Sequence, residues 1–250
     1  MSLTISAMLV ACSSALIIEG QKFDFFTKTL KRPSPSVILS HGSDCAVDYS
    51  IDLANKLNDW GFNAVILNHC SRRGIPPHTS TATYLSAWDR SDDYFLVSKW
   101  IKDQPWHAGA IAVVGWSQGG SGVLSTADYR TQKNSNRSDA EIDLIDAYVA
   151  FYPGCDIAAP PIQPHKPLLI LHGEVDELAL IGKCAYPKLK HRNYSIITYP
   201  NAGHGFDIPG PAVRMCKEPL GCFTTREYDP KATVQSREAV RAFLLRNLLP

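Results

Sequence analysis

The sequence has almost no charge imbalance. Lysine and arginine together number 25 against 24 aspartates and glutamates, which leaves a formal charge of +1. No block of like charge interrupts this balance, so neither a nucleic acid nor a charged membrane surface is indicated as a partner. No run of 18 or more apolar residues occurs, which argues against a membrane-spanning helix. No internal repeat, low-complexity tract or linker is visible. These absences favour a small molecule as the partner.

The seven cysteines lack the C-x-x-C spacing that is usual for zinc sites, so we expect no metal and no other cofactor. Seven are nevertheless more than a cytosolic enzyme usually carries. Cys216 and Cys222 bracket a short loop-like segment, and we predict a disulfide between them. Six cysteines allow fifteen pairings, among which the sequence does not choose. Cys45 and Cys70 follow two strand-like runs and could lie on the same edge of a parallel sheet, whereas Cys155 lies just beyond a strand-like run and Cys184 in the next helical stretch; these are possible pairs.

The remaining cysteine, Cys12, ends the run LVAC, which resembles the lipobox of a bacterial lipoprotein signal peptide. An apolar stretch precedes it, but no lysine or arginine occurs before Lys22, and such signals usually begin with basic residues. Two interpretations stay open. The first is export to the periplasm or outside the cell, with a lipid anchor at Cys12. The alternative is a cytoplasmic protein whose N-terminal segment is buried or frayed.

Length and composition suit one globular domain. The chain has 250 residues, of which 45% are hydrophobic and 20% charged. This is ordinary for a soluble enzyme and argues against disorder. We predict a single domain over residues 29–250, preceded by an N-terminal segment over residues 1–28. That segment contains an antiparallel hairpin, with strands over Ala15–Glu19 and Lys22–Lys28.

Strand-like and helix-like segments alternate along the domain, which predicts an α/β fold with a mostly parallel sheet and helices on both faces. Two stretches lack a clear pattern: Thr131–Glu141 is polar, and Asp207–Pro230 is rich in proline and glycine. We expect both to be loops, and the second to be a binding loop or lid. The predicted strands are Ser36–Ser40, Phe62–Leu67, Ala110–Val114, Ile145–Tyr152, Pro167–Leu171 and Tyr194–Tyr199, and the predicted helices are Val47–Trp60, Leu85–Ile101, Ala179–Leu189 and Ala232–Leu249.

The strongest chemical signal is the segment GWSQG, which has the pattern G-x-S-x-G around Ser117. In this pattern the serine lies on a strained turn between a strand and a helix, where only residues without bulk can flank it. The strand IAVVG before it and the helix-compatible GSGVLSTADY after it are the required surroundings. Ser117 is therefore the candidate nucleophile.

Two further polar residues follow later strands. Asp176 comes just after the strand that ends in LHG, and His204 lies in the small-residue loop NAGHGF. Because open α/β sheets place their sites at the carboxyl ends of the strands, these side chains can meet Ser117. The chain order Ser117, Asp176, His204 is that of the α/β-hydrolases. We predict that His204 is the base and Asp176 the acid that orients it.

Other acids compete for the role of Asp176. Glu174 and Glu177 lie on the same turn, and Asp207 is three residues from His204. We favour Asp176 over Asp207 because a carboxylate so close to the histidine in sequence would struggle to reach across its ring.

The oxyanion hole of this fold is built after an early strand, where His41-Gly42-Ser43 follows SVILS. We expect its donors to be the backbone N–H groups of Ser43 and Gln118, aimed at the charge that develops during acyl transfer. His41 either binds substrate or only shapes this loop. Trp116, beside the nucleophile, either packs in the core or lines the acyl pocket.

These segments together resemble the dienelactone hydrolase family across residues 30–248, which implies the α/β-hydrolase fold. The resemblance rests on the strand plus HGS, the RG pair at Arg73, GWSQGG, FYPGC, LHGEVDE and NAGHGFD. The family's founding enzymes carry cysteine where this sequence has Ser117, so a serine esterase mechanism is implied and dienelactone itself is put in doubt. They also grip a substrate carboxylate with arginines, one of them shortly after the histidine, where this sequence reads GFDIPG. Arg73, or else Arg72, is the candidate for that role; the alternative is a structural salt bridge.

We therefore expect a hydrolase of small carboxylic esters or lactones that works through an acyl-enzyme. Because folds do not fix substrates, a peptidase or an acyltransferase on the same scaffold is an alternative. A small-molecule-binding relative without catalysis is the third interpretation. A serine-reactive probe distinguishes the third from the other two, and a comparison of esters with peptides distinguishes the first from the second.

Overall fold

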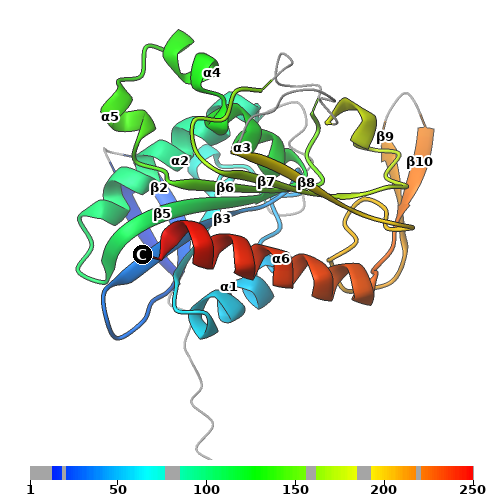
Figure 1. Cartoon of the computed structure of the whole chain (residues 1–250), viewed down its shortest axis with the longest axis horizontal. Coiled ribbons are helices and arrows are strands. Elements are labelled where there is room, and N and C mark those ends of the chain that lie inside the picture. Colours follow the sequence, from blue (N-terminus) through cyan, green and yellow to red (C-terminus); the bar gives the residue numbers. More distant parts are fainter. Residues whose placement is uncertain are drawn as a thin grey trace, which may run out of the picture.

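An eight-stranded sheet forms the centre of the molecule (Figure 1). The computed structural model describes residues 13–18, 21–76, 85–155, 162–184, 193–217 and 221–249. The strand order is β1-β2-β4-β3-β5-β6-β7-β8. The strands are β1 (Ser13–Ile18), β2 (Gln21–Lys28), β3 (Ser34–Ser40), β4 (Asn63–Asn68), β5 (His107–Trp116), β6 (Ala147–Phe151), β7 (Leu168–Gly173) and β8 (Tyr194–Tyr199).

The strands β3 to β8 run parallel, and the hairpin of β1 and β2 joins them antiparallel through β4. The predicted mostly parallel sheet and the opening hairpin are thus confirmed. Apolar side chains fill both faces of the central strands, as expected for parallel sheets covered on both sides. In β3, Ile38 packs in one core cluster, whereas Val37 and Leu39 pack in the other.

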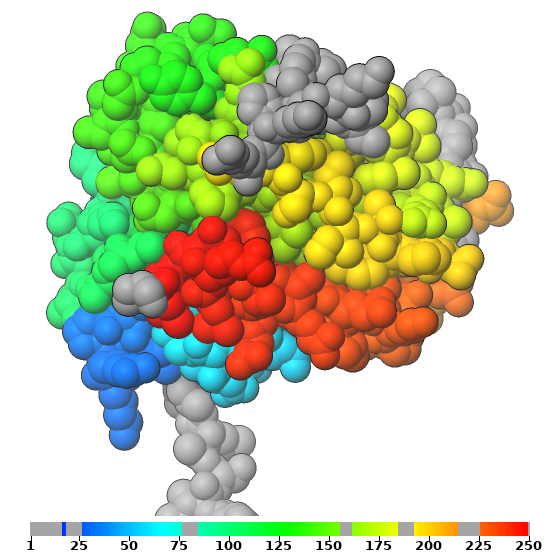
Figure 2. Space-filling view, in the orientation of Figure 1, coloured from blue at the N-terminus to red at the C-terminus, as the bar shows by residue number. Residues whose placement is uncertain are grey.

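Helices cover both faces of the sheet. The helices α1 (Ser50–Asp59) and α6 (Pro230–Leu248) pack on the face of Val37, and α2 (Ala87–Lys102) and α3 (Gln118–Ala127) pack on the face of Ile38. Figure 1 shows these two layers on opposite sides of the strands. In the space-filling view, α6 lies across the front of the molecule with α1 directly below it (Figure 2).

Local signals fix where the two longest helices begin. At α2, the Ser86 hydroxyl accepts the N–H of Asp89, and the Asp89 carboxylate accepts the N–H of Ser86, which makes a capping box. At α6, the Asp229 carboxylate accepts the N–H of Ala232, and Pro230 occupies the first helical position, where its missing N–H costs nothing.

The predicted loop Thr131–Glu141 is wrong, because two short helices, α4 (Tyr129–Asn134) and α5 (Asp139–Ile142), occupy most of it. Because these helices are short and polar, they show no hydrophobic periodicity by which they could be predicted. The start of α5 carries a signal that could have been used: Ser138 and Glu141 form an S-x-x-E capping box.

Two other expectations are corrected in part. Within Ala179–Leu189, the described residues form only a 3₁₀ turn, η2 (Ile181–Lys183), and residues 185–192 lie outside them. The stretch Asp207–Pro230 is not irregular throughout, because β9 (Val213–Lys217) and β10 (Gly221–Arg226) pair as an antiparallel hairpin.

Two disulfides join loops at the carboxyl edge of the sheet, Cys45–Cys70 and Cys155–Cys184. Such bonds are typical of oxidising compartments. The backbone register of β9 and β10 places Cys216 opposite Cys222, but their side chains are not described, so that disulfide stays a prediction. Cys12, the predicted lipid-anchor residue, lies outside the described residues. Among the described helices, none combines the length and apolar character that a membrane span requires.

The carboxyl ends of the parallel strands meet at one edge, where the chain changes direction across the sheet. From β3 the chain passes through α1 to β4 on one side, and then through α2 to β5 on the other side of β3. The loops after β3 and β5 therefore diverge and leave a crevice, which is where open α/β sheets bind ligands. The loops after β3, β5, β7 and β8 carry Ser43, Ser117, Asp176 and His204, respectively.

Candidate active site

Ser117 lies on a sharp turn between β5 and α3. Its backbone angles are φ 51° and ψ −115°, which a non-glycine residue rarely adopts. The turn brings two backbone segments into contact, so its flanking positions have no room for side chains. A Cβ on Gly115 would lie 2.4 Å from the carbonyl oxygen of Gly119, and a Cβ on Gly119 would lie 2.5 Å from that of His41. The glycines of the G-x-S-x-G pattern are therefore required by close backbone approach.

A continuous series of hydrogen bonds links the serine to a histidine and an aspartate. His204 Nε2 lies 2.8 Å from Ser117 Oγ, and His204 Nδ1 lies 2.8 Å from Asp176 Oδ2. The other oxygen of Asp176 accepts the backbone N–H groups of Leu178 and Ala179, both at 2.9 Å. This carboxylate has no proton to donate when ionised, so Nδ1 carries the proton and Nε2 is left to accept from the serine.

The rival acids lie elsewhere. Glu174 is exposed, and its carboxylate accepts from the Thr198 hydroxyl at 2.7 Å. Glu177 is exposed as well. Asp207 is buried, but it faces away from the His204 ring: it accepts from Trp116 Nε1 at 2.9 Å, the Tyr152 hydroxyl at 2.7 Å and Arg237 at 2.8 Å. The geometry brings only Asp176 of these four acids to the histidine.

The loop after β3 lies against Ser117. A Cβ on Gly42 would lie 3.6 Å from the Cβ of Ser117, so the backbone of this loop is close to the serine side chain. The Gly42 N–H donates to the Tyr49 hydroxyl, which fixes the loop on α1's leading turn. Gln118 is the first residue of α3, so its N–H belongs to the electropositive end of that helix. Both expected oxyanion donors thus border the serine.

A small cavity of about 70 Å³ opens beside Ser117 and His204. Its walls mix aromatic side chains with one cation, Arg226 from the end of β10. Burial raises the pKa of the Tyr152 hydroxyl well above its ordinary value, with the nearby Asp207 carboxylate acting in the same direction, so Tyr152 stays a donor. The cavity is lined by Gly42, Ser43, Asp44, Tyr49, Trp116, Ser117, Tyr152, His204, Gly205, Ile208 and Arg226.

Trp116 lines this cavity and also packs in the core, where its ring stacks on Phe151. His41 and Arg73, the other expected substrate-binding residues, are not among the described residues that line it. His41 is buried, and both its ring nitrogens meet backbone groups: Nδ1 bonds to the Gly42 carbonyl and Nε2 accepts the His69 N–H. Arg73 donates to Asp93 at 2.8 Å and to the His69 carbonyl at 2.9 Å, which is the salt-bridge alternative.

Tyr49, Arg226 and Ile208 were not singled out from the sequence as neighbours of Ser117. Arg226 and Ile208 lie within Asp207–Pro230, the stretch expected to be a binding loop or lid, but tertiary packing alone selects these residues and Tyr49 for the cavity. Tyr152 could have been found, because it directly follows a buried strand in FYPGC, and such strand ends border the site.

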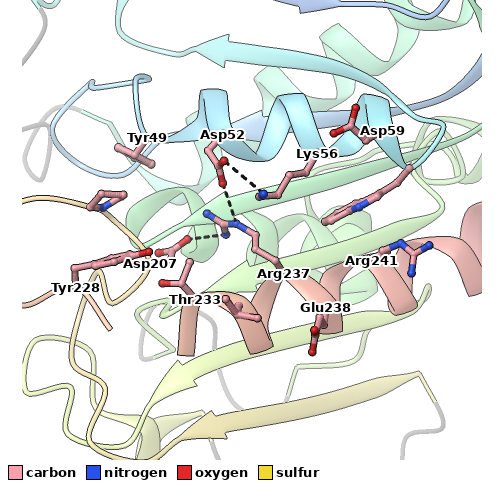
Figure 3. Close-up of a pocket in the computed structure, with 13 residues that line it drawn as sticks. Tyr49, Asp52, Lys56, Asp59, Asp207, Tyr228, Thr233, Arg237, Glu238 and Arg241 are labelled. Carbon is pink, nitrogen blue, oxygen red and sulfur yellow. Dashed lines mark hydrogen bonds and ion pairs between the residues drawn. The ribbon is translucent and has the colours of Figure 1, made fainter. Parts of the chain in front are cut away.

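A larger cavity of about 490 Å³ lies between α1 and α6 (Figure 3). At its inner end Arg237 donates to Asp207, and Arg237 also approaches Asp52 of α1, as the dashed lines show. Tyr49 borders both cavities. The larger hollow contains neither Ser117 nor His204, so the candidate active site is assigned from the hydrogen-bonded series and not from cavity size.

No group of three metal-binding side chains is arranged around a common point among the described residues.

Comparisons with known proteins agree with this fold. The sequence profile of the dienelactone hydrolase family matches residues 26–248. By sequence, no curated protein matches significantly. Three solved structures share the fold: a Klebsiella pneumoniae protein named for the dienelactone hydrolases (18% identity, 95% of this chain and 98% of that chain, TM-score 0.70), Est1E of Butyrivibrio proteoclasticus with ferulic acid bound (17%, 94% and 98%, 0.64) and the esterase Est2 of Thermogutta terrifontis (15%, 96% and 94%, 0.64).

These identities are low enough that the three structures establish the fold alone. The family match covers most of the chain, from β2 to the last turn of α6. This chain therefore belongs to the dienelactone hydrolase family of hydrolases.

Proposed function

We propose that the protein is a serine esterase that cleaves small carboxylic esters or lactones through an acyl-enzyme. One observation carries the proposal: the unbroken hydrogen-bonded series from Asp176 through His204 to Ser117, beside an open cavity. His204 takes the proton from Ser117 Oγ as this oxygen attacks the carbonyl carbon. Asp176 holds the imidazole tautomer and stabilises the imidazolium that forms.

The rest of the cycle follows from the same groups. The N–H groups of Ser43 and Gln118 stabilise the oxyanion of the tetrahedral intermediate. His204 then returns the proton to the leaving alcohol oxygen, and Ser117 keeps the acyl group as an ester. Water then attacks the carbonyl carbon of that ester while His204 takes one of its protons. The bond between the acyl carbon and Ser117 Oγ breaks, His204 returns the proton to Oγ, and the carboxylic acid leaves. In a lactone, the leaving alcohol stays attached to the acyl group.

The size of the cavity favours short acyl groups. A water molecule needs roughly 10–15 Å³ of such space, so about 70 Å³ holds about five water-sized groups. Trp116, Tyr152 and Ile208 give the cavity apolar walls, which suit an alkyl chain of a few carbons. The neighbour Est2 is named as an esterase, which supports the reaction class.

The test is hydrolysis of p-nitrophenyl acetate, butyrate and octanoate, with a peptide p-nitroanilide beside them, by the wild type and by Ser117→Ala. We expect turnover of acetate and butyrate, weak turnover of octanoate and none of the anilide. Removal of the nucleophile of such a series costs about 10⁶-fold in kcat, so Ser117→Ala should be inactive. Equal rates in both proteins would exclude Ser117 as the nucleophile, and preference for the anilide would indicate a peptidase.

A further inference from the structure

A fully buried arginine lies behind the proposed oxyanion hole. Arg90 belongs to α2, and its side chain is 0% exposed. It donates to the carbonyl of His41 at 2.8 Å, the carbonyl of Gly42 at 2.9 Å and the Gln118 side-chain oxygen at 2.9 Å, and over 3.5 Å to the Ser40 hydroxyl at the end of β3. The first three acceptors belong to the two segments that border Ser117. Arg90 thus connects the loop after β3 to the start of α3.

No carboxylate pairs with Arg90 among the described residues. Asp93 of the same helix acts on Arg90 through its charge, but its carboxylate is already bonded to His69, Arg72 and Arg73. A charge that is buried with only dipoles around it costs free energy, and such groups are uncommon unless they are paired. An apolar side chain of similar size could fill this space without the free-energy cost of a buried charge. The uncompensated charge therefore calls for another explanation.

The bonds of Arg90 act on the peptide that carries the expected Ser43 donor. The His69 N–H donates to His41 Nε2, so the proton of His41 is on Nδ1 and is donated to the Gly42 carbonyl. That carbonyl therefore accepts from His41 and from Arg90. Since the C=O and N–H of one peptide polarise together, donors on the Gly42 oxygen strengthen the Ser43 N–H as a donor.

The second expected donor is held through its side chain. Gln118 accepts from Arg90 with Oε1 and donates with Nε2 to the Leu85 carbonyl at 2.8 Å. Gly122, one turn later in α3, makes room for this arrangement, because a Cβ there would lie 2.8 Å from the Cβ of Arg90. The close approach of α2 and α3 thus allows Arg90 to reach both segments.

We propose that Arg90 is the positioning residue of the oxyanion hole: it holds the Ser43 and Gln118 N–H groups in register and adds a fixed positive charge behind them. This inference rests on the proposed esterase function and deepens it. A cation at this position stabilises the tetrahedral oxyanion more than the neutral ester, because charge develops only in the transition state. Its contribution therefore belongs to kcat rather than to KM.

The experiment compares Arg90→Met and Arg90→Lys with Arg137→Met, which replaces a partly buried arginine that pairs with Asp92 and lies outside the two segments that border Ser117. For each folded protein we measure kcat and KM with p-nitrophenyl acetate, and Ki for butylboronic acid, which forms a tetrahedral anion on a reactive serine. Loss of one oxyanion donor costs about 10²–10³-fold in kcat, and Arg90 acts through such donors. We therefore expect Arg90→Met to lose about 10- to 100-fold in kcat with KM within about twofold.

Arg90→Lys keeps the charge but not the bridge, so it should recover part of this loss. The boronic acid should bind more weakly in each Arg90 variant by the same factor that kcat/KM falls, and Arg137→Met should match the wild type. A merely structural role would lower Tm without this parallel. If Arg90→Met does not fold, the same kinetic and boronic acid measurements on Arg90→Lys test the proposal. If neither variant folds, the measurements are made on Gln118→Leu, which keeps the backbone N–H and removes one hydrogen bond of Arg90.

Folded variants with unchanged kcat, or with reduced kcat and unchanged boronic acid affinity, overturn the role of Arg90. A wild type that neither hydrolyses the ester nor binds the boronic acid overturns the proposed function instead. The two failures are therefore distinguishable in one set of measurements.

Discussion

Replacement of Asp207 by asparagine should destabilise the protein strongly, because it breaks a buried ion pair and a buried set of hydrogen bonds. The Asp207 carboxylate is buried and accepts from three donors on three different elements: Trp116 at the end of β5, Tyr152 after β6 and Arg237 of α6. Asparagine keeps one acceptor oxygen and turns an NH₂ group toward donors. It also leaves the Arg237 guanidinium without its buried partner, since Asp52 lies 3.6 Å from Arg237 Nε and is exposed (Figure 3).

Breaking a buried ion pair by removal of one partner costs about 3–5 kcal/mol. For a chain of this size each kcal/mol shifts Tm by about 2–4 °C, so we expect Asp207→Asn to lower Tm by roughly 6–20 °C. The measurement is urea unfolding at 25 °C and calorimetry, with disulfides kept intact. Activity at that temperature should fall as well, because Asp207 fixes the residue before Ser117 and lies on the loop of His204.

A double-mutant cycle checks the cause. Arg237→Met together with Asp207→Asn removes the unpaired charge, so the double variant should be more stable than the sum of the two single losses predicts. Asp207→Asn that unfolds at the wild-type urea midpoint, or strictly additive losses in the cycle, would contradict the assignment of this pair as the main bond between α6 and the site.

Two further predictions concern the loop after β3 and its surroundings. Burial lowers the pKa of His69 from 6.5 to about 4, so between these pH values the unfolded chain binds a proton at His69 that the folded chain does not. The contribution of His69 to stability should therefore fall by about 3 kcal/mol as pH drops from about 6.5 to 4, beside smaller losses from other buried histidines such as His172. Urea unfolding at pH 7.5, 6 and 5 measures the free energy of unfolding. If that free energy falls as steeply with pH in His69→Gln as in the wild type, His69 is not its cause. Gly119→Ala should abolish activity and cost several kcal/mol, because its Cβ would lie 2.5 Å from the His41 carbonyl oxygen and 2.6 Å from that of Ser40. Gly182→Ala, which meets nothing within 4 Å, should stay within about 0.5 kcal/mol of the wild type, and equal losses in both would refute the steric argument.

Much of the candidate site could be predicted because its residues follow parallel strands. Ser117 and Asp176 follow the buried, apolar ends of β5 and β7, and His204 follows β8, a partly exposed edge strand. Side chains after the carboxyl ends of parallel strands lie at the same edge of the sheet. The sequence therefore places the three side chains at one edge, although only the structure gives the 2.8 Å contacts.

The remainder depended on packing between distant segments. Arg90 and Asp93 stand in the charged run DRSDD, which looks solvent-exposed in sequence, yet both side chains are buried where α2 meets α3 and the loop after β4. The pairing of Cys45 with Cys70, and of Cys155 with Cys184, likewise follows from which loops meet in space. The helices α4 and α5 are too short and polar for periodicity to reveal.

The most direct test of the central claim is the site of covalent labelling by a fluorophosphonate. The wild type is treated with the probe, digested and analysed by mass spectrometry, with Ser117→Ala as the control. If His204 activates Ser117 as proposed, one adduct forms per chain, it maps to Ser117, and the control stays unlabelled. An unlabelled wild type, or an adduct that persists at another residue in Ser117→Ala, would show that this serine is not the nucleophile.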